Sequence, residues 1–189
     1  MKKEVEILVE VLDTKNDAIK KLGDFKFLGD KKTLDVYFFD PKRDDLQPDK
    51  KGQLKNCLRL RNKDGKASVA YKVDHFDKKG IWLYSDEYET EVTDFSKIGE
   101  IFNKLGLEEL IRIENTKSTF VTENYEIVLE DVKDLGIFME VERHNVHDKE
   151  DILKVKEEIL NWIKNLNIKV SLELTMGKPE LMLRKKLKV

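Results

Sequence analysis

The stretch Glu-Val-Glu-Ile-Leu-Val-Glu-Val at residues 4–11 alternates between two kinds of side chain. In an extended chain the apolar residues at 5, 7, 9 and 11 share one face, and Glu4, Glu6, Leu8 and Glu10 share the other. The stretch therefore predicts a β-strand with one face in an apolar core. Three carboxylates on one face repel one another unless something positive or solvent meets them. A divalent metal, a set of arginines and lysines, or bulk water could do so.

Composition limits the kinds of protein to which this chain can belong. A chain of 189 residues that is 40% hydrophobic can bury one good core, so we expect a single domain over residues 1–189. The 36 basic and 38 acidic residues nearly cancel, so no overall field attracts nucleic acid or an anionic membrane. The single cysteine, Cys57, excludes an internal disulfide and a cysteine metal cluster. No apolar run approaches the roughly 20 residues that span a bilayer, and no signal-peptide core follows the start, so we expect a cytoplasmic protein.

Periodicity predicts many short strands and few helices. Further alternating stretches lie at about 33–39, 57–62, 68–73, 86–92, 116–121, 125–131 and 137–143, and helical patterns fit 14–22, 95–105 and 148–166. Turn signals at 62–66 and 123–124 predict antiparallel hairpins. The pattern predicts an α+β fold, an eight-stranded antiparallel β-barrel with helices packed outside. The basic tail at about 177–189 is expected to be a solvated helix or a frayed end.

Nearly every predicted strand has one charged face. This is typical of ordinary strands with polar residues toward solvent. The charges are also segregated by sign, with basic residues in the middle strands and paired carboxylates at both ends of the strand order. That segregation favours a barrel with an ionic interior and an apolar outside covered by helices. The basic residues are Arg59, Arg61, Lys72 and Lys117, and the paired carboxylates include Glu140 and Glu142.

Several of these strands resemble a known family in the right order. Glu4-Val5-Glu6 resembles the first part of the Glu-x-Glu-x-Lys signature of the CYTH superfamily, the triphosphate tunnel enzymes. The stretch 57–61, Cys-Leu-Arg-Leu-Arg, is similar to the family's Leu-Arg-x-Arg strand, and Tyr71-Lys72 to its next-strand lysine. The acidic strand at 87–92 resembles the one before the family's middle helix. The stretch 136–142, Gly-Ile-Phe-Met-Glu-Val-Glu, is similar to its Gly-x-Phe-x-Glu-x-Glu strand.

The resemblance implies a metal-dependent phosphohydrolase acting inside a charged tunnel. Its partner would be a small molecule that contains a triphosphate (inorganic triphosphate, a nucleoside triphosphate or thiamine triphosphate) or a polyphosphate; no nucleic acid or membrane is expected, and a homodimer is possible. The alternatives are a class IV adenylyl cyclase and a catalytically impaired tunnel that binds polyanions. The implied substrate-binding residues are Arg59, Arg61, Lys72, Arg112 and Lys117. The implied ligands of Mg²⁺ or Mn²⁺ are Glu4, Glu6, Glu140 and Glu142, and the implied catalytic residues are Glu4, Glu6, Lys72 and Glu130.

The chain also departs from the family pattern. The signature lysine falls on Leu8, and a basic residue that often follows it falls on Glu10. The basic residue two positions before Lys117 falls on Asn115, for which Arg112 could compensate. We therefore expect at least one phosphate-binding donor to be missing. If Leu8 faces the tunnel, activity should be reduced or redirected.

Overall fold

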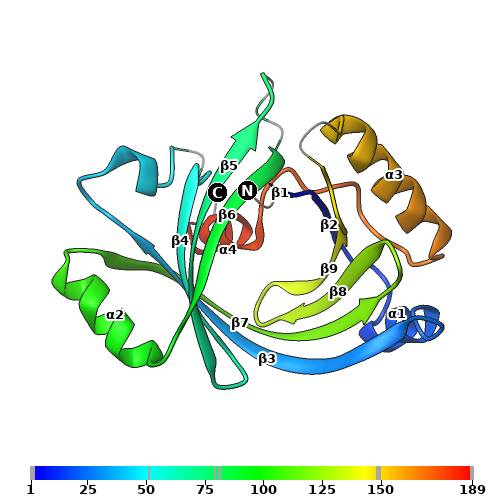
Figure 1. The fold of residues 1–189 in the computed structure, drawn as a ribbon, viewed down its shortest axis with the longest axis horizontal. Helices are drawn as coiled ribbons and strands as arrows, with labels where there is room; N and C mark the ends of the chain where they lie inside the picture. The colour runs from blue at the N-terminus through cyan, green and yellow to red at the C-terminus, as the bar shows by residue number, and fades with distance from the viewer. Residues whose placement is uncertain (1–2, 51, 79, 81, 148–149, 188–189) are drawn as a thin grey trace.

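The protein folds around one curled antiparallel sheet. The computed structural model describes residues 3–50, 52–78, 80, 82–147 and 150–187. The opening stretch forms β1 (Lys3–Glu4) and β2 (Glu6–Glu10), separated only by Val5. The sheet order is β1-β6-β5-β4-β3-β7-β8-β9-β2. Because β1 pairs with β6 and β2 pairs with β9, the opening stretch joins the two ends of the sheet, which curls around an interior space (Figure 1).

The remaining strands follow the predicted order and are mostly longer than predicted. The hairpin turn between β4 and β5 contains Asp64 and Gly65, both with positive φ, as the turn signal predicts. One large difference lies at the start of β3, where the side chains are mostly exposed and where a register shift at Gly29 interrupts the alternation. The bounds are β3 Lys26–Phe39, β4 Asn56–Lys63, β5 Lys66–Phe76, β6 Trp82–Val92, β7 Glu108–Val121, β8 Tyr125–Val132 and β9 Gly136–Arg143.

Three helices cover the outside of the sheet, as predicted (Figure 1). They are α1 (Lys15–Lys21), α2 (Phe95–Lys104) and α3 (Ile152–Asn165), and a short 3-10 turn, η1 (Asp44–Leu46), lies between β3 and β4. The side chains of Thr14, Asp94 and Asp151 accept hydrogen bonds from backbone N–H groups in the first turns. Because Asp151 caps α3, that helix begins later than the predicted 148.

The apolar face of the opening stretch packs outward against α3. Val5, Ile7 and Val9 are at most 1% exposed and belong to the largest core cluster, together with Ile159 and Ile163 of α3. Burial of this kind contributes roughly 25 cal/mol per Å² of apolar surface. The carboxylate face of the same strand is thereby turned toward the interior of the sheet, as the alternation predicts.

The C-terminal helix α4 (Lys178–Leu187) corrects the expectation for the tail. It is neither solvated nor frayed, because it lies across the space enclosed by the sheet (Figure 1). Met182 and Leu183 are 7% and 6% exposed and pack in a cluster with Leu8 and Phe138. The apolar face of α4 is short and lies among basic residues, so the sequence pattern does not indicate it. No helix in the described part of the chain is long and apolar enough to span a membrane.

Candidate functional site

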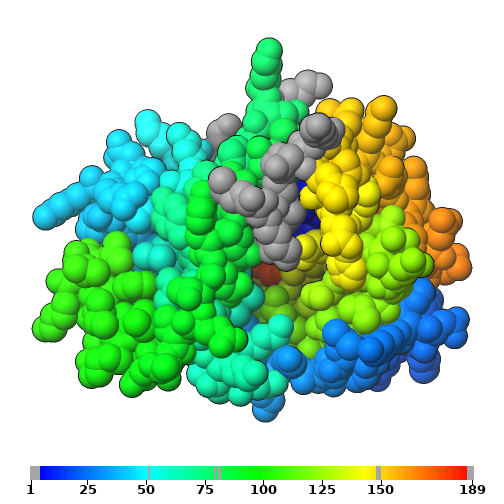
Figure 2. Space-filling view, viewed as in Figure 1, coloured from blue at the N-terminus to red at the C-terminus, as the bar shows by residue number. Residues whose placement is uncertain are grey.

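The interior of the curled sheet holds a cavity of about 240 Å³, and more than half of the residues that line it are charged. Figure 2 shows the opening between β6 and β9, with α4 at its base. Its walls come from the inward faces of the strands and from the first turn of α4. The basic lining residues are Arg59, Arg61, Lys63, Lys72, Lys117 and Lys178, and the acidic ones are Glu6, Asp35, Asp74, Glu87, Glu89, Glu126, Glu140, Glu142 and Glu180.

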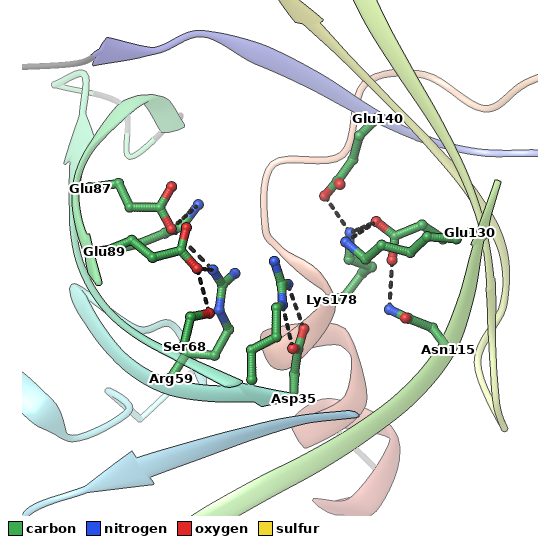
Figure 3. A network of polar contacts seen from close by, with 12 residues as sticks. Asp35, Arg59, Ser68, Glu87, Glu89, Asn115, Glu130, Glu140 and Lys178 are labelled. Atoms are coloured by element: carbon green, nitrogen blue, oxygen red, sulfur yellow. Dashed lines mark hydrogen bonds and ion pairs between the residues drawn. The ribbon is translucent and has the colours of Figure 1, made fainter. Parts of the chain in front are cut away.

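Two arginines of β4 form one wall. Arg61 donates two hydrogen bonds, of 2.6 and 2.7 Å, to the carboxylate of Asp35, which is 3% exposed. Burial alone would raise the pKa of Asp35, but the charge and hydrogen bonds of Arg61 outweigh it and hold that pKa far below its ordinary value. Asp35 is therefore ionised and fixes the guanidinium of Arg61 in place (Figure 3).

Arg59 has a donor to spare. One terminal nitrogen of its guanidinium donates to Glu87 at 3.1 Å, and the residue is 7% exposed. Its Nε is buried and has no hydrogen-bond partner among the described residues. A buried donor without an acceptor costs about 1 to 3 kcal/mol, so the site gains when an acceptor enters. Lys72 lies near the same carboxylate, with its Nζ 3.4 Å from Glu87 Oε1.

The cavity has a strongly positive end at the β4–β5 hairpin. Burial lowers the pKa of Lys63, and the charges of Lys117, Arg61 and Lys31 lower it further. Lys31 and Lys117 are also direct cross-strand partners, an arrangement that is unfavourable for like charges. An anion at this end would relieve the repulsion. Lys63 was not among the predicted site residues, although it continues the phase of Arg59 and Arg61.

The opposite wall is organised by Glu130, which is 0% exposed. Its Oε2 accepts a hydrogen bond from Asn115 at 2.7 Å, and its Oε1 is 2.9 Å from the ammonium of Lys117 and 2.8 Å from that of Lys178. The ammonium of Lys178 also contacts Glu140 (Figure 3). One carboxylate thus holds two ammonium groups side by side.

The pKa values of the two carboxyls of this wall are shifted in opposite directions. Burial raises the pKa of Glu130, and the neighbouring charge of Glu140 raises it further. Burial also acts on Glu140, but Lys178 and Lys117 hold its pKa well below the ordinary value. Glu130, for which a catalytic role is predicted, is enclosed by its partners and is not among the residues that line the cavity. Its contacts position the ammonium groups of Lys117 and Lys178.

Carboxylates line up across three neighbouring strands. The register places Glu142 of β9 directly between Glu6 of β2 and Glu126 of β8, and all three line the cavity. Carboxylates directly opposite one another repel unless a cation lies between them. Within the described part of the chain no three acidic, histidine or cysteine side chains are gathered closely enough to hold a metal by themselves. Mg²⁺ commonly uses only one or two carboxylates and completes its shell with water and phosphate oxygens, so Glu6 and Glu142 fit this chemistry.

Three further residues singled out in the sequence are Glu4, Arg112 and Leu8. The side chain of Glu4 lies outside the described part of the structure. Arg112 does not reach the cavity: it is exposed and pairs with Glu109 at 2.7 Å. Because side chains alternate along β7, Arg112 faces away from Asn115 and Lys117 and cannot compensate for Asn115. Leu8 borders the cavity but is only 4% exposed and packs among apolar neighbours.

The structure also brings in residues that sequence reasoning missed. Lys178 and Glu180 enter the cavity from α4, and Asp74 does so from β5. Glu180 is 4% exposed, and its burial raises its pKa to about 7, with the charge of Asp74 adding to the effect. Asp74 accepts a hydrogen bond of 2.6 Å from Ser85. Asp74 shares the phase of Lys72 and could have been found; the α4 residues follow only from the position of the helix.

Comparisons with known proteins agree on one family. The family model described as CYTH domain matches residues 2–173. A Methanocaldococcus jannaschii protein named "Putative adenylate cyclase MJ0240" is 37% identical over 168 residues, which cover 87% of this chain and 90% of the relative. Among solved structures, PH1819 from Pyrococcus horikoshii has a TM-score of 0.77 at 24% identity, covering 95% of this chain and 99% of that one.

A second solved structure carries a functional description of its own. HpAC1 from Hippeastrum, an adenylyl cyclase candidate described as having a dominant triphosphatase activity, has a TM-score of 0.65 at 16% identity and covers 97% of this chain and 96% of its own. These structural likenesses show the shared fold, while the family model and the 37% identical relative show the family. With its charged interior, its paired arginines and its curled antiparallel sheet, this chain belongs to the CYTH family.

Proposed function

We propose that this protein is a metal-dependent phosphohydrolase that binds a triphosphate chain in its cavity and releases phosphate from it. The substrate class is inorganic triphosphate, polyphosphate or a nucleoside or thiamine triphosphate. The observation that carries the proposal is Arg59, which lines the cavity and whose buried Nε has no hydrogen-bond partner among the described residues. Hydrogen bonds between guanidinium groups and phosphate are among the strongest in proteins, and the planar fork of arginine suits phosphate oxygens.

The surrounding charges support the same substrate class. A triphosphate carries about four negative charges near neutral pH, so a cavity that excludes water must supply several cations. Arg59, Lys63, Lys72 and Lys117 surround the cavity and would divide that charge among them. Arg61 is already bound to Asp35 and would orient the phosphate chain with its remaining N–H groups.

The carboxylate row would hold the metal. Glu6 and Glu142, with Glu140 beside them, present the hard oxygen ligands that Mg²⁺ and Mn²⁺ prefer. When bound, such an ion neutralises phosphate charge and lowers the pKa of a coordinated water. Glu4 and Lys72 remain proposed participants: Glu4 as a further metal ligand, and Lys72 as a donor to the transferred phosphoryl group.

A phosphate-release assay with matched variants tests the proposal. The wild-type protein should release phosphate from triphosphate, ATP or thiamine triphosphate in the presence of Mg²⁺ or Mn²⁺ and not in the presence of a chelator. Arg59→Gln should lower kcat/KM by about 10- to 100-fold, the equivalent of one lost charged hydrogen bond of about 1.5 to 3 kcal/mol. Arg112→Gln is the control, since Arg112 is exposed and lies outside the cavity, and it should leave the rate unchanged.

The outcomes separate hydrolysis from binding alone. Release by the wild type that depends on Arg59 supports a hydrolase. No release at high enzyme concentration, while triphosphate still raises the melting temperature, identifies a tunnel that only binds polyanions. Neither release nor a change in melting temperature with any of the three substrates would refute the proposed substrate class.

Adenylyl cyclase activity is the second candidate. It is favoured by the name of the 37% identical relative, which assigns that protein to the adenylate cyclases. The same cations would bind ATP, but the ribose 3′-oxygen would attack the α-phosphorus and pyrophosphate would leave. Measuring cyclic AMP and pyrophosphate beside phosphate in the assay above distinguishes the two reactions.

A further inference from the structure

The C-terminal helix α4 is attached to the opening strand at Leu8. Leu8 packs in one apolar cluster with Met182 and Leu183 of α4, and Leu174 packs against the same cluster. The backbone N–H of Leu174 also donates to the carbonyl oxygen of Leu8 at 2.9 Å. The apolar side chain at position 8 therefore forms part of the seat on which α4 rests.

The first residue of α4 brings a charge to the cavity wall. Lys178 is 8% exposed, lines the cavity, and contacts Glu130 at 2.8 Å and also Glu140. Glu140 is the direct cross-strand partner of Leu8. The ammonium of Lys178 therefore lies at the level of the strand where Leu8 itself offers no donor.

The ammonium groups of Lys178 and Lys117 also lie close together. Both ammonium groups bind the same oxygen, Glu130 Oε1, at 2.8 and 2.9 Å, so their separation cannot exceed the sum of these two distances. Two cations held this close by one carboxylate suit a phosphate group that bridges them. An ammonium has three N–H donors, and the two carboxylates of Lys178 use two of them, which leaves one for a ligand in the cavity.

From these contacts we propose that Lys178 is a substrate-binding residue, which donates from α4 to a phosphate oxygen at the level of Leu8, and that Leu8 is apolar because it seats the helix that carries this lysine. The inference rests on the proposed function, since it requires a phosphate chain in the cavity. It gives α4 a role in ligand binding that the exposed lysines of the same helix do not share. The missing donor at position 8 is replaced from a distant part of the chain.

The test exchanges the two side chains. Lys178→Met should weaken binding of tripolyphosphate, measured by calorimetry with Mg²⁺ present, by about tenfold or more. The double variant Leu8→Lys with Lys178→Met should recover most of that loss, because a lysine at position 8 would lie beside Glu140. Lys186→Met is the matched control: Lys186 is exposed on the same helix, and its variant should bind like the wild type.

Melting temperatures of all variants separate folding from binding. If Lys178→Met is folded and binds as tightly as the wild type, Lys178 only neutralises buried carboxylates and the inference is wrong. A folded double variant that recovers nothing would equally overturn it. Should Lys178→Met not fold, the side-chain ammonium signal of Lys178 in wild-type protein with ¹⁵N-labelled lysine decides: it should shift on addition of tripolyphosphate, and an unchanged signal refutes the inference.

The same experiment keeps the two proposals apart. If the wild type does not bind tripolyphosphate with or without Mg²⁺, the proposed function fails and the role of Lys178 fails with it. If the wild type binds and only the lysine variants behave contrary to expectation, the proposed function stands and the inference about α4 alone is refuted.

Discussion

Replacing Glu180 with glutamine should change how the stability of the protein depends on pH. Glu180 is 4% exposed in the first turn of α4, and its pKa rises from an ordinary value of 4.5 to about 7, chiefly because burial disfavours its charged form. Glutamine has nearly the same shape and can still accept the backbone hydrogen bond from Leu54, but it does not titrate. The variant therefore removes one ionisation with little change in packing.

The sign follows from proton binding. Between pH 4.5 and about 7 the folded protein keeps a proton on Glu180 that the unfolded chain has released, so the free energy of unfolding falls as pH rises through this window. At about 1.4 kcal/mol for each unit of pKa, the loss comes to about 3 kcal/mol. Below pH 4.5 both states are protonated and the contribution is constant.

Urea denaturation of wild type and Glu180→Gln at pH 5 and pH 8 measures this loss. Asp74 also has a pKa raised by burial and adds a slope of the same sign, so the difference between the two proteins is the relevant quantity. Relative to the wild type, the free energy of unfolding of Glu180→Gln should rise by about 2.5 kcal/mol from pH 5 to pH 8, because part of the window lies below pH 5. The control is Glu157→Gln, which changes an exposed glutamate of α3. Its free energy of unfolding should change between the two pH values by the same amount as that of the wild type. Parallel pH profiles for wild type and Glu180→Gln would refute the burial of an ionisable Glu180.

Three further predictions concern single side chains. Arg61→Met should destabilise the fold by about 3 to 5 kcal/mol in urea denaturation, because it leaves Asp35 buried and without its bidentate partner; a loss below about 1 kcal/mol would contradict the ion pair. Lys63→Met should raise the Kd for tripolyphosphate and weaken its dependence on salt, since it removes one cation from the crowded positive end of the cavity; an unchanged salt dependence would exclude Lys63 from the site. Cys57 should react with a thiol reagent only after unfolding, because it is 8% exposed and burial raises the pKa of its thiol; rapid labelling of the native protein would contradict this.

The alternation of apolar and polar side chains along the strands predicted most of the fold. The inward direction of Arg59 and Arg61 and the outward packing of Val5, Ile7 and Val9 follow from a period of two, which needs no knowledge of distant contacts. The prediction for Arg112 is wrong because Arg112 has the opposite parity to Asn115 and Lys117 along β7 and therefore faces away from the cavity. Alternation indicates the face that Glu130 occupies but not that its neighbours bury it completely.

The sequence by itself determined the order of the strands, the sign of the charge on their inner faces and the absence of a lysine at position 8. Only the tertiary structure decided how those charges combine. Lys178 lies 170 positions after Leu8 in the chain, and no periodicity links them; their proximity arises because α4 folds back into the curled sheet and packs its apolar face against Leu8. Local patterns report on neighbours along the chain, whereas a binding site is assembled from groups that long-range packing brings together.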